Sequence, residues 1–94
     1  MAKRKALPSW FRELDLRESL LVWLGSAQSR YESAAISAFG DRFSAKEIRR
    51  ELRALQHDRY IMLMEFDRVR WAISMSGRNQ AAPARARAQK ARAA

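Results

Sequence analysis

Apolar residues recur at intervals of three and four positions from residue 15 to about residue 29, which is the spacing of a helix that buries one face. Asp15 and Glu18 form a D-x-x-E variant of the capping box, which satisfies free amides at a helix start. The residues expected on the buried face are Leu16, Leu20, Leu21, Trp23, Leu24 and Ala27. The sequence therefore predicts a first helix that ends near Ser29.

Two shorter segments flank this first helix. Residues 31–39 predict a second, short helix that ends at Gly40, a residue type that commonly terminates helices. Residues 9–14, with the sequence S-W-F-R-E-L, predict a helical turn ahead of the first helix. The side chains expected to reach the core, or a partner subunit, from these two segments are Trp10, Phe11, Leu14, Ala35, Ile36 and Phe39.

The segment from residue 44 to residue 58 sorts its side chains by chemistry around a third predicted helix. It opens with a complete S-x-x-E capping box, and its apolar stripe consists of Ile48, Leu52 and Leu55. The residues of the opposite arc are Lys46, Arg49, Arg50, Arg53 and His57, and those of a flanking strip are Glu47, Glu51 and Asp58. A face that serves only solubility more often mixes the two signs through i,i+4 pairs. The sorting therefore favours a contact between the basic arc and something negatively charged over the alternative of an ordinary solvated face.

From Tyr60 onward the pattern changes to the alternation of β-strands. The stretch V-R-W-A-I-S-M alternates strictly, and Y-I-M-L-M-E-F before it is rich in strand-forming residues on both faces. The pairs expected from a turn at Asp67-Arg68, or from a four-residue loop in the same register, are Phe66–Val69, Glu65–Arg70, Met64–Trp71 and Met62–Ile73. This register puts apolar opposite apolar and acid opposite base, which favours a hairpin.

The length of 94 residues indicates one domain with a core of modest size. The absence of cysteine excludes disulfides, thiol catalysis and cysteine-ligated zinc. A single histidine cannot build a two-histidine metal site, and the sequence contains no glycine-rich phosphate loop, so no enzyme activity, cofactor or metal is expected. No apolar run approaches the roughly 18–20 residues of a membrane span, and M-A-K-R-K-A-L-P does not predict a signal peptide. A cytoplasmic location is expected.

The formal net charge of +9 is concentrated at the two ends of the chain. Residues 1–7 form a basic arm, and residues 79–94 form an alanine- and arginine-rich tail with no acidic residue. Between them, residues 8–78 hold the predicted folded domain. Because the tail has no large apolar side chain, it is expected to be disordered or to act as a non-specific phosphate-binding arm.

The order of helix, short helix, glycine turn, basic helix and hairpin resembles a winged helix-turn-helix domain. A-A-I-S-A-F-G resembles the second helix of such a domain, S-A-K-E-I-R-R-E-L-R-A-L-Q-H-D-R-Y-I the recognition helix and its exit, and W-A-I-S-M-S-G-R the returning wing strand. The last of these is similar to the aromatic-x-Leu-Thr-x-x-Gly-Arg ending of many bacterial winged-helix regulators. The likeness covers residues 16–78 and implies an α+β fold of three helices followed by a two-stranded wing. One departure is Arg59, where these families usually carry a glycine with positive φ.

The resemblance implies a small bacterial or phage transcriptional regulator whose residues 44–58 read the major groove of double-stranded DNA. Arginine suits this work because its planar fork binds guanine O6 and N7 together. The residues expected to contact DNA are Ser44, Lys46, Arg49, Arg50, Arg53, Gln56, Arg68 and Arg70. Ser44 and its neighbouring amides would hold a phosphate. Gln56 could instead be an incidental surface residue, and Arg70 could instead pair with Glu65.

Other partners remain open from the sequence. Winged-helix domains also serve as protein-interaction modules, for example as phage-type proteins that bind a host protein in the host cytoplasm. The first strand of the hairpin is apolar on both faces, with Ile61 and Leu63 on one and Met62 and Met64 on the other. Only one face can pack on the core of the domain, so the other needs a separate cover. This second face could be covered by residues 9–14, by a second subunit or by another protein. A homodimer through residues 9–24 and the hairpin is favoured, and no membrane contact is expected.

Overall fold

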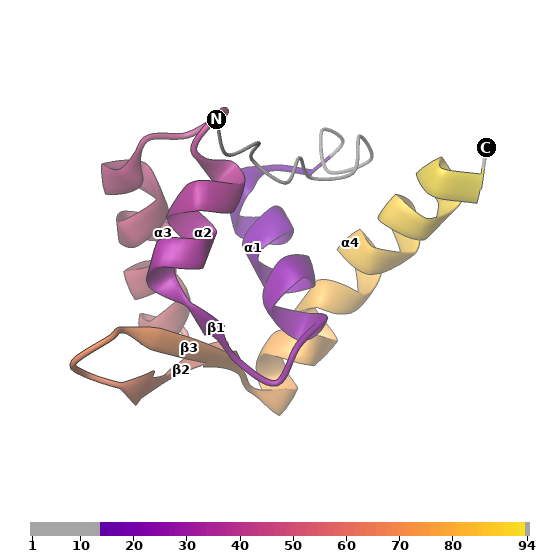
Figure 1. Cartoon of the computed structure of the whole chain (residues 1–94). Helices are drawn as coiled ribbons and strands as arrows, with labels where there is room; N and C mark the ends of the chain where they lie inside the picture. Colours follow the sequence, from indigo (N-terminus) through magenta and orange to yellow (C-terminus); the bar gives the residue numbers. More distant parts are fainter. Residues whose placement is uncertain (1–13, 94) are drawn as a thin grey trace.

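The computed structural model describes residues 14–93, with side chains described as far as residue 90. The fold is α+β, with four helices and a three-stranded antiparallel sheet among these residues (Figure 1). The elements in chain order are α1 (Leu16–Gly25), β1 (Arg30–Tyr31), α2 (Glu32–Phe39), α3 (Ala45–His57), β2 (Ile61–Glu65), β3 (Arg70–Ile73) and α4 (Met75–Ala93). The α+β class is thus confirmed. The expected set of three helices and two strands is incomplete, because β1 and α4 are also present.

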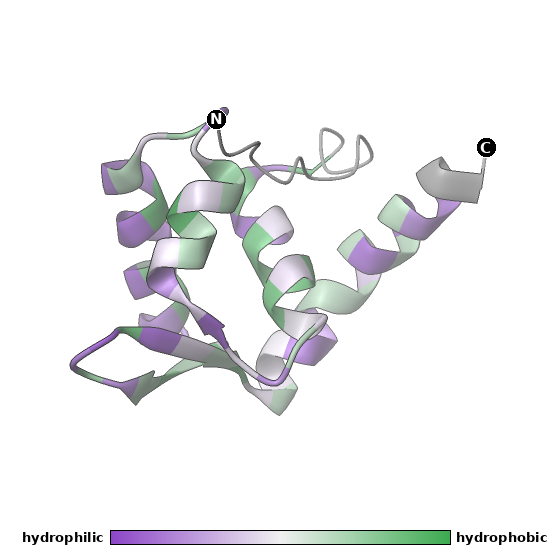
Figure 2. Ribbon diagram, viewed as in Figure 1, coloured by the Kyte–Doolittle hydropathy of each residue, from purple (hydrophilic) through white to green (hydrophobic). Residues whose placement is uncertain are grey.

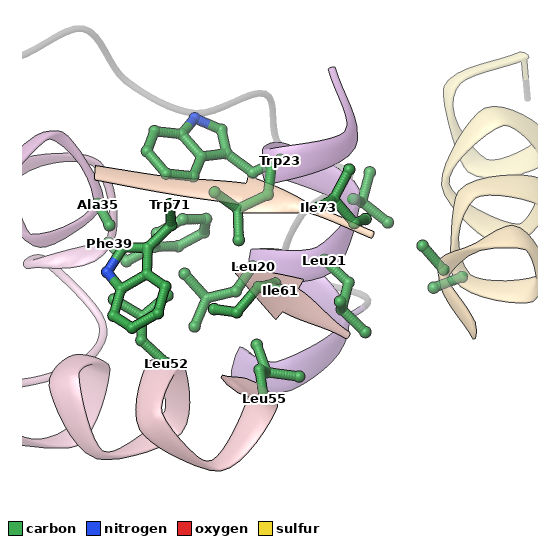
Figure 3. Packing of buried hydrophobic residues seen from close by; sticks show 14 of the residues in the cluster. Leu20, Leu21, Trp23, Ala35, Phe39, Leu52, Leu55, Ile61, Trp71 and Ile73 are labelled. Carbon is green, nitrogen blue, oxygen red and sulfur yellow. The ribbon is translucent and has the colours of Figure 1, made fainter. Parts of the chain in front are cut away.

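The hydrophobic core joins α1, α2, α3 and the sheet (Figure 3). The three residues predicted as the apolar stripe of α3 are completely buried, namely Ile48, Leu52 and Leu55. The rings of Trp23 and Phe39 meet edge to face, with centroids 5.6 Å apart and planes at 85°. Buried side chains from sequence-distant elements therefore hold the helices around the sheet.

The boundaries of α1 differ from the sequence prediction at its C-terminal end. The Asp15–Glu18 capping box is present at its start, but the helix ends at Gly25 rather than near Ser29. Consequently Ala27 lies after the helix instead of on its buried face. Leu14 is buried in the core as expected, whereas the predictions for residues 1–13 lie outside the described residues.

The strand β1 was not predicted, because residue 31 was assigned to the start of the second helix. Tyr31 instead pairs with Arg70, and Arg30 pairs with Trp71, which gives the sheet order β1-β3-β2. The amide of Glu32 then donates to the carbonyl of Val69 at 2.8 Å. A strand of two residues is too short to show alternation in a sequence, so its pairing had to come from the structure.

The hairpin departs from the predicted register because β2 contains a bulge. Glu65 pairs with Arg70 as predicted, but the register shifts between Leu63 and Glu65, and Met64 is the extra residue. The remaining pairs are Leu63–Trp71, Met62–Ala72 and Ile61–Ile73, in place of Met64–Trp71 and Met62–Ile73. A shift of one residue turns the preceding side chains to the other face. The bulge therefore turns Leu63 toward the core and leaves the two methionines outside.

Residues 79–93 of the tail are helical in the structure, whereas their composition predicted disorder. They continue the helix α4, which passes α1 on its way to the C-terminus (Figure 1) and includes Pro83. Figure 2 shows hydrophobic and hydrophilic segments alternating along this helix. The buried residues of α4 recur at helical spacing and are Gly77, Ala81, Ala84 and Ala88. Small side chains thus supply the buried face, so no large apolar residue is needed.

The start of α4 is fastened to the turn that follows α3. Ser74 donates its amide to the Tyr60 carbonyl at 2.9 Å, and its hydroxyl oxygen accepts from the Gly77 amide at 3.1 Å. The Ser74 hydroxyl also lies 2.7 Å from the carbonyl oxygen of Arg59, to which it can donate. A Cβ at residue 77 would lie 2.1 Å from the Tyr60 carbonyl oxygen, so only glycine fits there. The S-x-x-G sequence is therefore explained by close packing.

Among residues 14–93, the structure contains no helix with the length and apolar character that crossing a membrane requires.

Candidate functional site

The helix α3 is held at both ends by backbone-directed contacts. At its start, the Ser44 hydroxyl accepts from the Glu47 amide at 3.1 Å, while the Glu47 carboxylate accepts from the Ser44 amide at 3.2 Å. At its end, Tyr60 donates its amide to the Leu55 carbonyl and Arg59 donates to the Gln56 carbonyl, which together make a Schellman motif. Arg59 adopts a φ of 64°, a backbone conformation that glycine adopts more readily than other residues.

The acidic strip of α3 makes contacts within the chain, although Glu47 and Asp58 remain exposed. Arg17 of α1 donates to Glu51 at 3.3 Å and to Asp58, and its guanidinium lies 5.4 Å from the centre of the Tyr60 ring. Burial disfavours the charge on Arg17, but the hydrogen bonds to the two carboxylates outweigh it and raise the pKa of Arg17. The Arg17 hydrogen bond in turn lowers the pKa of Asp58. With Glu47 in the cap, every acid of this strip has a folding role.

The basic arc of α3 is exposed, and most of it has no acidic partner. Lys46, Arg50 and Arg53 are exposed and form no ion pair with any residue in the range 14–90. Figure 2 shows the two sides of α3 in contrasting colours, hydrophilic outward and hydrophobic toward the body. Gln56 is also exposed, at the last turn of the helix. The structure thus brings these predicted site residues together on one outward surface.

Arg49 differs from the other arginines of this arc because it forms an ion pair with a residue of α2. Its Nε lies 3.7 Å from a Glu32 carboxylate oxygen, and the other oxygen of Glu32 accepts from the Trp71 indole at 3.4 Å. Glu32 therefore links the basic arc to the core. The sequence analysis did not identify Glu32 as part of this region. The only signal in the sequence was its position at a helix start, which indicates no more than a capping role.

The two arginines predicted on the hairpin are positioned by Tyr31 of β1. The guanidinium of Arg68 lies 4.4 Å from the centre of the Tyr31 ring, and that of Arg70 lies 6.0 Å from it. The Nε of Arg70 is also 3.5 Å from a Glu65 carboxylate oxygen. This is the internal Arg70–Glu65 pair that the sequence analysis gave as the alternative to a DNA contact. Arg68 is exposed, whereas Arg70 is partly covered. Arg68 is therefore the better placed of the two for an external contact.

The hairpin and the basic arc meet at a shallow depression of about 300 Å³. Its walls come from β1, α2, α3 and the hairpin, and its lining residues are Tyr31, Glu32, Ser33, Ile36, Arg49, Arg68 and Val69. Arg49 and Arg68 stand in the same depression although 19 positions separate them in the chain. The predicted helix and hairpin contacts are thus parts of one continuous surface.

The basic residues of α4 are engaged mainly with α1. Arg78 donates to the Gly25 carbonyl at 3.3 Å, and Arg87 forms an ion pair with Glu18. The Arg85 side chain lies beside Gly25, close enough to touch a Cβ placed there. These contacts attach the tail to the domain, so the positive charge of α4 is less available than its composition indicates.

No group of three or more histidine, aspartate or glutamate side chains within residues 14–93 is arranged to hold a metal ion. Comparison of the sequence with models of known protein families and with curated proteins finds no match.

Proposed function

We propose that this chain is a winged helix-turn-helix protein that binds double-stranded DNA with sequence specificity and acts as a small transcriptional regulator. In this proposal α3 is the recognition helix and enters the major groove, and the β2–β3 hairpin is the wing. The order α1-β1-α2-α3-β2-β3, with β1 pairing to the wing, supports the assignment.

The observation that carries the proposal is the division of charge on α3. Its acids are used internally by the Ser44 cap and by Arg17, whereas Lys46, Arg50 and Arg53 are left exposed without partners among the described residues. Clustering like charges costs free energy through repulsion, and these three side chains form no ion pair among the described residues that would offset it. Phosphates and guanine edges would supply that compensation in a complex.

Each group has a distinct expected role. Arg50 and Arg53 are the base-reading candidates, because a guanidinium that makes no internal contact can present both donors to guanine. Arg49 and Arg68, which share the depression beside Tyr31, are candidates for the flanking phosphates. Phosphate contacts fix the register of a protein on DNA, while base contacts give the sequence preference.

The experiment compares two double variants that remove the same charge from different surfaces. Arg50→Ala with Arg53→Ala should remove the preference for a selected duplex over a scrambled one, because removing each arginine–guanine pair costs about 1–3 kcal/mol. Arg85→Ala with Lys90→Ala on α4 should weaken binding to both duplexes equally. Fluorescence anisotropy across a salt series measures both effects, and circular dichroism verifies that the variants fold.

The salt dependence separates the two surfaces further. Removing a side chain that neutralises one phosphate should reduce the log–log slope of affinity against salt by about 0.9, without changing the ratio of the two affinities. The recognition-helix assignment is wrong if the Arg50/Arg53 variant keeps the parent's preference for the selected duplex.

A further inference from the structure

The outer side of the hairpin carries a strip of large apolar side chains that the fold does not cover. Met62, Met64 and Phe66 are 48%, 51% and 84% exposed, and all three belong to β2 or the residue that follows it. Met62 and Met64 point outward from the same strand, whereas Ile61 and Leu63 face the core, and Phe66 follows in the turn after the bulge. Contiguous exposed apolar residues of this kind mark contact surfaces.

The strip lies at the edge of the sheet. The strand order is β1-β3-β2, so no described strand stands beyond β2. By contrast, the apolar residues of α1 that could have formed a subunit contact are buried within the chain, including Leu20, Trp23 and Leu24. Two segments were expected to mediate a homodimer. The apolar residues in the described part of 9–24 are used in the core of the chain itself, so the hairpin is the segment still available for a subunit contact.

The two ends of the strip carry opposite charges that lack internal partners. Arg59 precedes β2, Asp67 follows it, and both are exposed. Neither forms an ion pair with any residue from 14 to 90, in contrast to Glu65, which pairs with Arg70. A surface that is positive at one end, apolar in the middle and negative at the other is complementary to itself after a two-fold rotation.

We propose that this strip is the contact between two copies of the chain, which pack antiparallel through β2. The methionines and Phe66 of the two copies would cover one another, and Arg59 of each copy would face Asp67 of the other. The isologous arrangement forms both charge pairs at once, which a partner of unrelated sequence would have no reason to match. Arg68 and the basic arc of α3 take no part in this contact.

The apolar part of the proposal is tested by light scattering and sedimentation of the full chain over a range of concentrations. The parent should show a reversible monomer–dimer equilibrium. Met62→Lys with Met64→Lys should weaken the dimer roughly tenfold or more, because it buries like charges at the contact. Met75→Lys is the matched control, since Met75 is 73% exposed but lies at the start of α4, and it should leave the equilibrium unchanged.

The charged part is tested by reversal and mixing. Arg59→Asp and Asp67→Arg should each weaken self-association, because each places two like pairs across the two-fold axis. An equimolar mixture of these two variants should recover the parent dimer as a mixed species, detected by labelling one variant. A double variant that carries both reversals should also recover it alone. Aspartate is suitable at residue 59 because it tolerates positive φ.

The proposal is overturned if the parent is monomeric throughout, which would leave the strip to another protein or to the N-terminal residues. It is equally overturned if Met75→Lys disrupts the dimer as strongly as the β2 changes, or if the mixture of reversed variants fails to associate. These samples contain no DNA, so the result is independent of the proposed function.

Discussion

Arg17 of α1 and Asp58 at the end of α3 form an ion pair in which Nη2 and Oδ2 are 2.5 Å apart. The same guanidinium reaches Glu51, about two turns earlier on the helix, so a single side chain fixes the position of α3 against α1. This contact gives the acids of α3 a structural role. It thereby separates them from Lys46, Arg50 and Arg53, which form no ion pair with the described residues.

Asp58→Asn should destabilise the protein at neutral pH but make little difference in acid. The Arg17 hydrogen bond holds the pKa of Asp58 below its ordinary value of 3.8, so the folded state favours the ionised carboxyl. This stabilisation is present above the unfolded-state pKa and disappears as the pH falls through the lower folded-state pKa. Urea unfolding of both proteins over a pH series measures the difference, which would contradict the assignment if it persisted unchanged in strong acid.

Arg59→Gly should stabilise the fold by about 1 kcal/mol. The residue has a φ of 64°, which an arginine adopts at a steric cost that glycine avoids. Arg53→Gly is the contrasting control, because the same substitution inside α3 should cost about 1 kcal/mol. Chemical denaturation at one low protein concentration gives both values. Destabilisation by Arg59→Gly would show that the guanidinium makes a contact worth more than the strain.

Gly77→Ala should destabilise by about 1–3 kcal/mol, as overpacking typically does. Its Cβ would meet the Tyr60 carbonyl oxygen at 2.1 Å and the Ile73 side chain at 2.7 Å, and the former is backbone that cannot move alone. Gly25→Ala is the control, since the nearest atom there is the end of the flexible Arg85 side chain at 2.7 Å. Thermal unfolding should separate the two variants, and equal midpoints would contradict the close packing at residue 77.

Truncation before residue 79 should destabilise the domain rather than only weaken a charge interaction. Beyond residue 78, the buried face of α4 consists of Ala81, Ala84 and Ala88, and Arg87 adds an ion pair to Glu18 of α1. Removing them exposes apolar surface of α1 to water. Calorimetry of the 1–78 fragment should therefore show a lower midpoint than that of the full chain, whereas an unchanged midpoint would indicate that the tail has no role in stability.

The sequence was sufficient for α3 because its pattern is local and redundant. The capping box at Ser44, the stripe headed by Ile48 and the sorted charges all indicate one helix in one orientation, and the structure agrees. The sequence analysis noted Arg59 only as a departure from a glycine position, and the structure gives this residue a φ of 64°. The partners of the acidic strip were not predictable, because Arg17 is far from them in sequence and only the packing of α1 brings it near.

The features that were missed depend on small residues or on single-residue shifts. The helix α4 buries alanines, and alanine in an arginine-rich segment is equally compatible with a disordered tail and with a docked helix. The bulge at Met64 changes the face of every earlier residue of β2, yet it has no sequence signal, since β2 lacks the glycine that often marks one. For the same reason, the outward strip of methionines could not be assigned before the structure was known.

The most direct test of the central claim is selection of duplexes from a randomised DNA library by the full-length chain. The account predicts enrichment of a motif with guanines at the positions read by Arg50 and Arg53, and disappearance of those guanine preferences when the selection is repeated with Arg50→Ala and Arg53→Ala. A selection that enriches no motif, or a motif that survives both substitutions unchanged, would contradict the claim that α3 reads DNA.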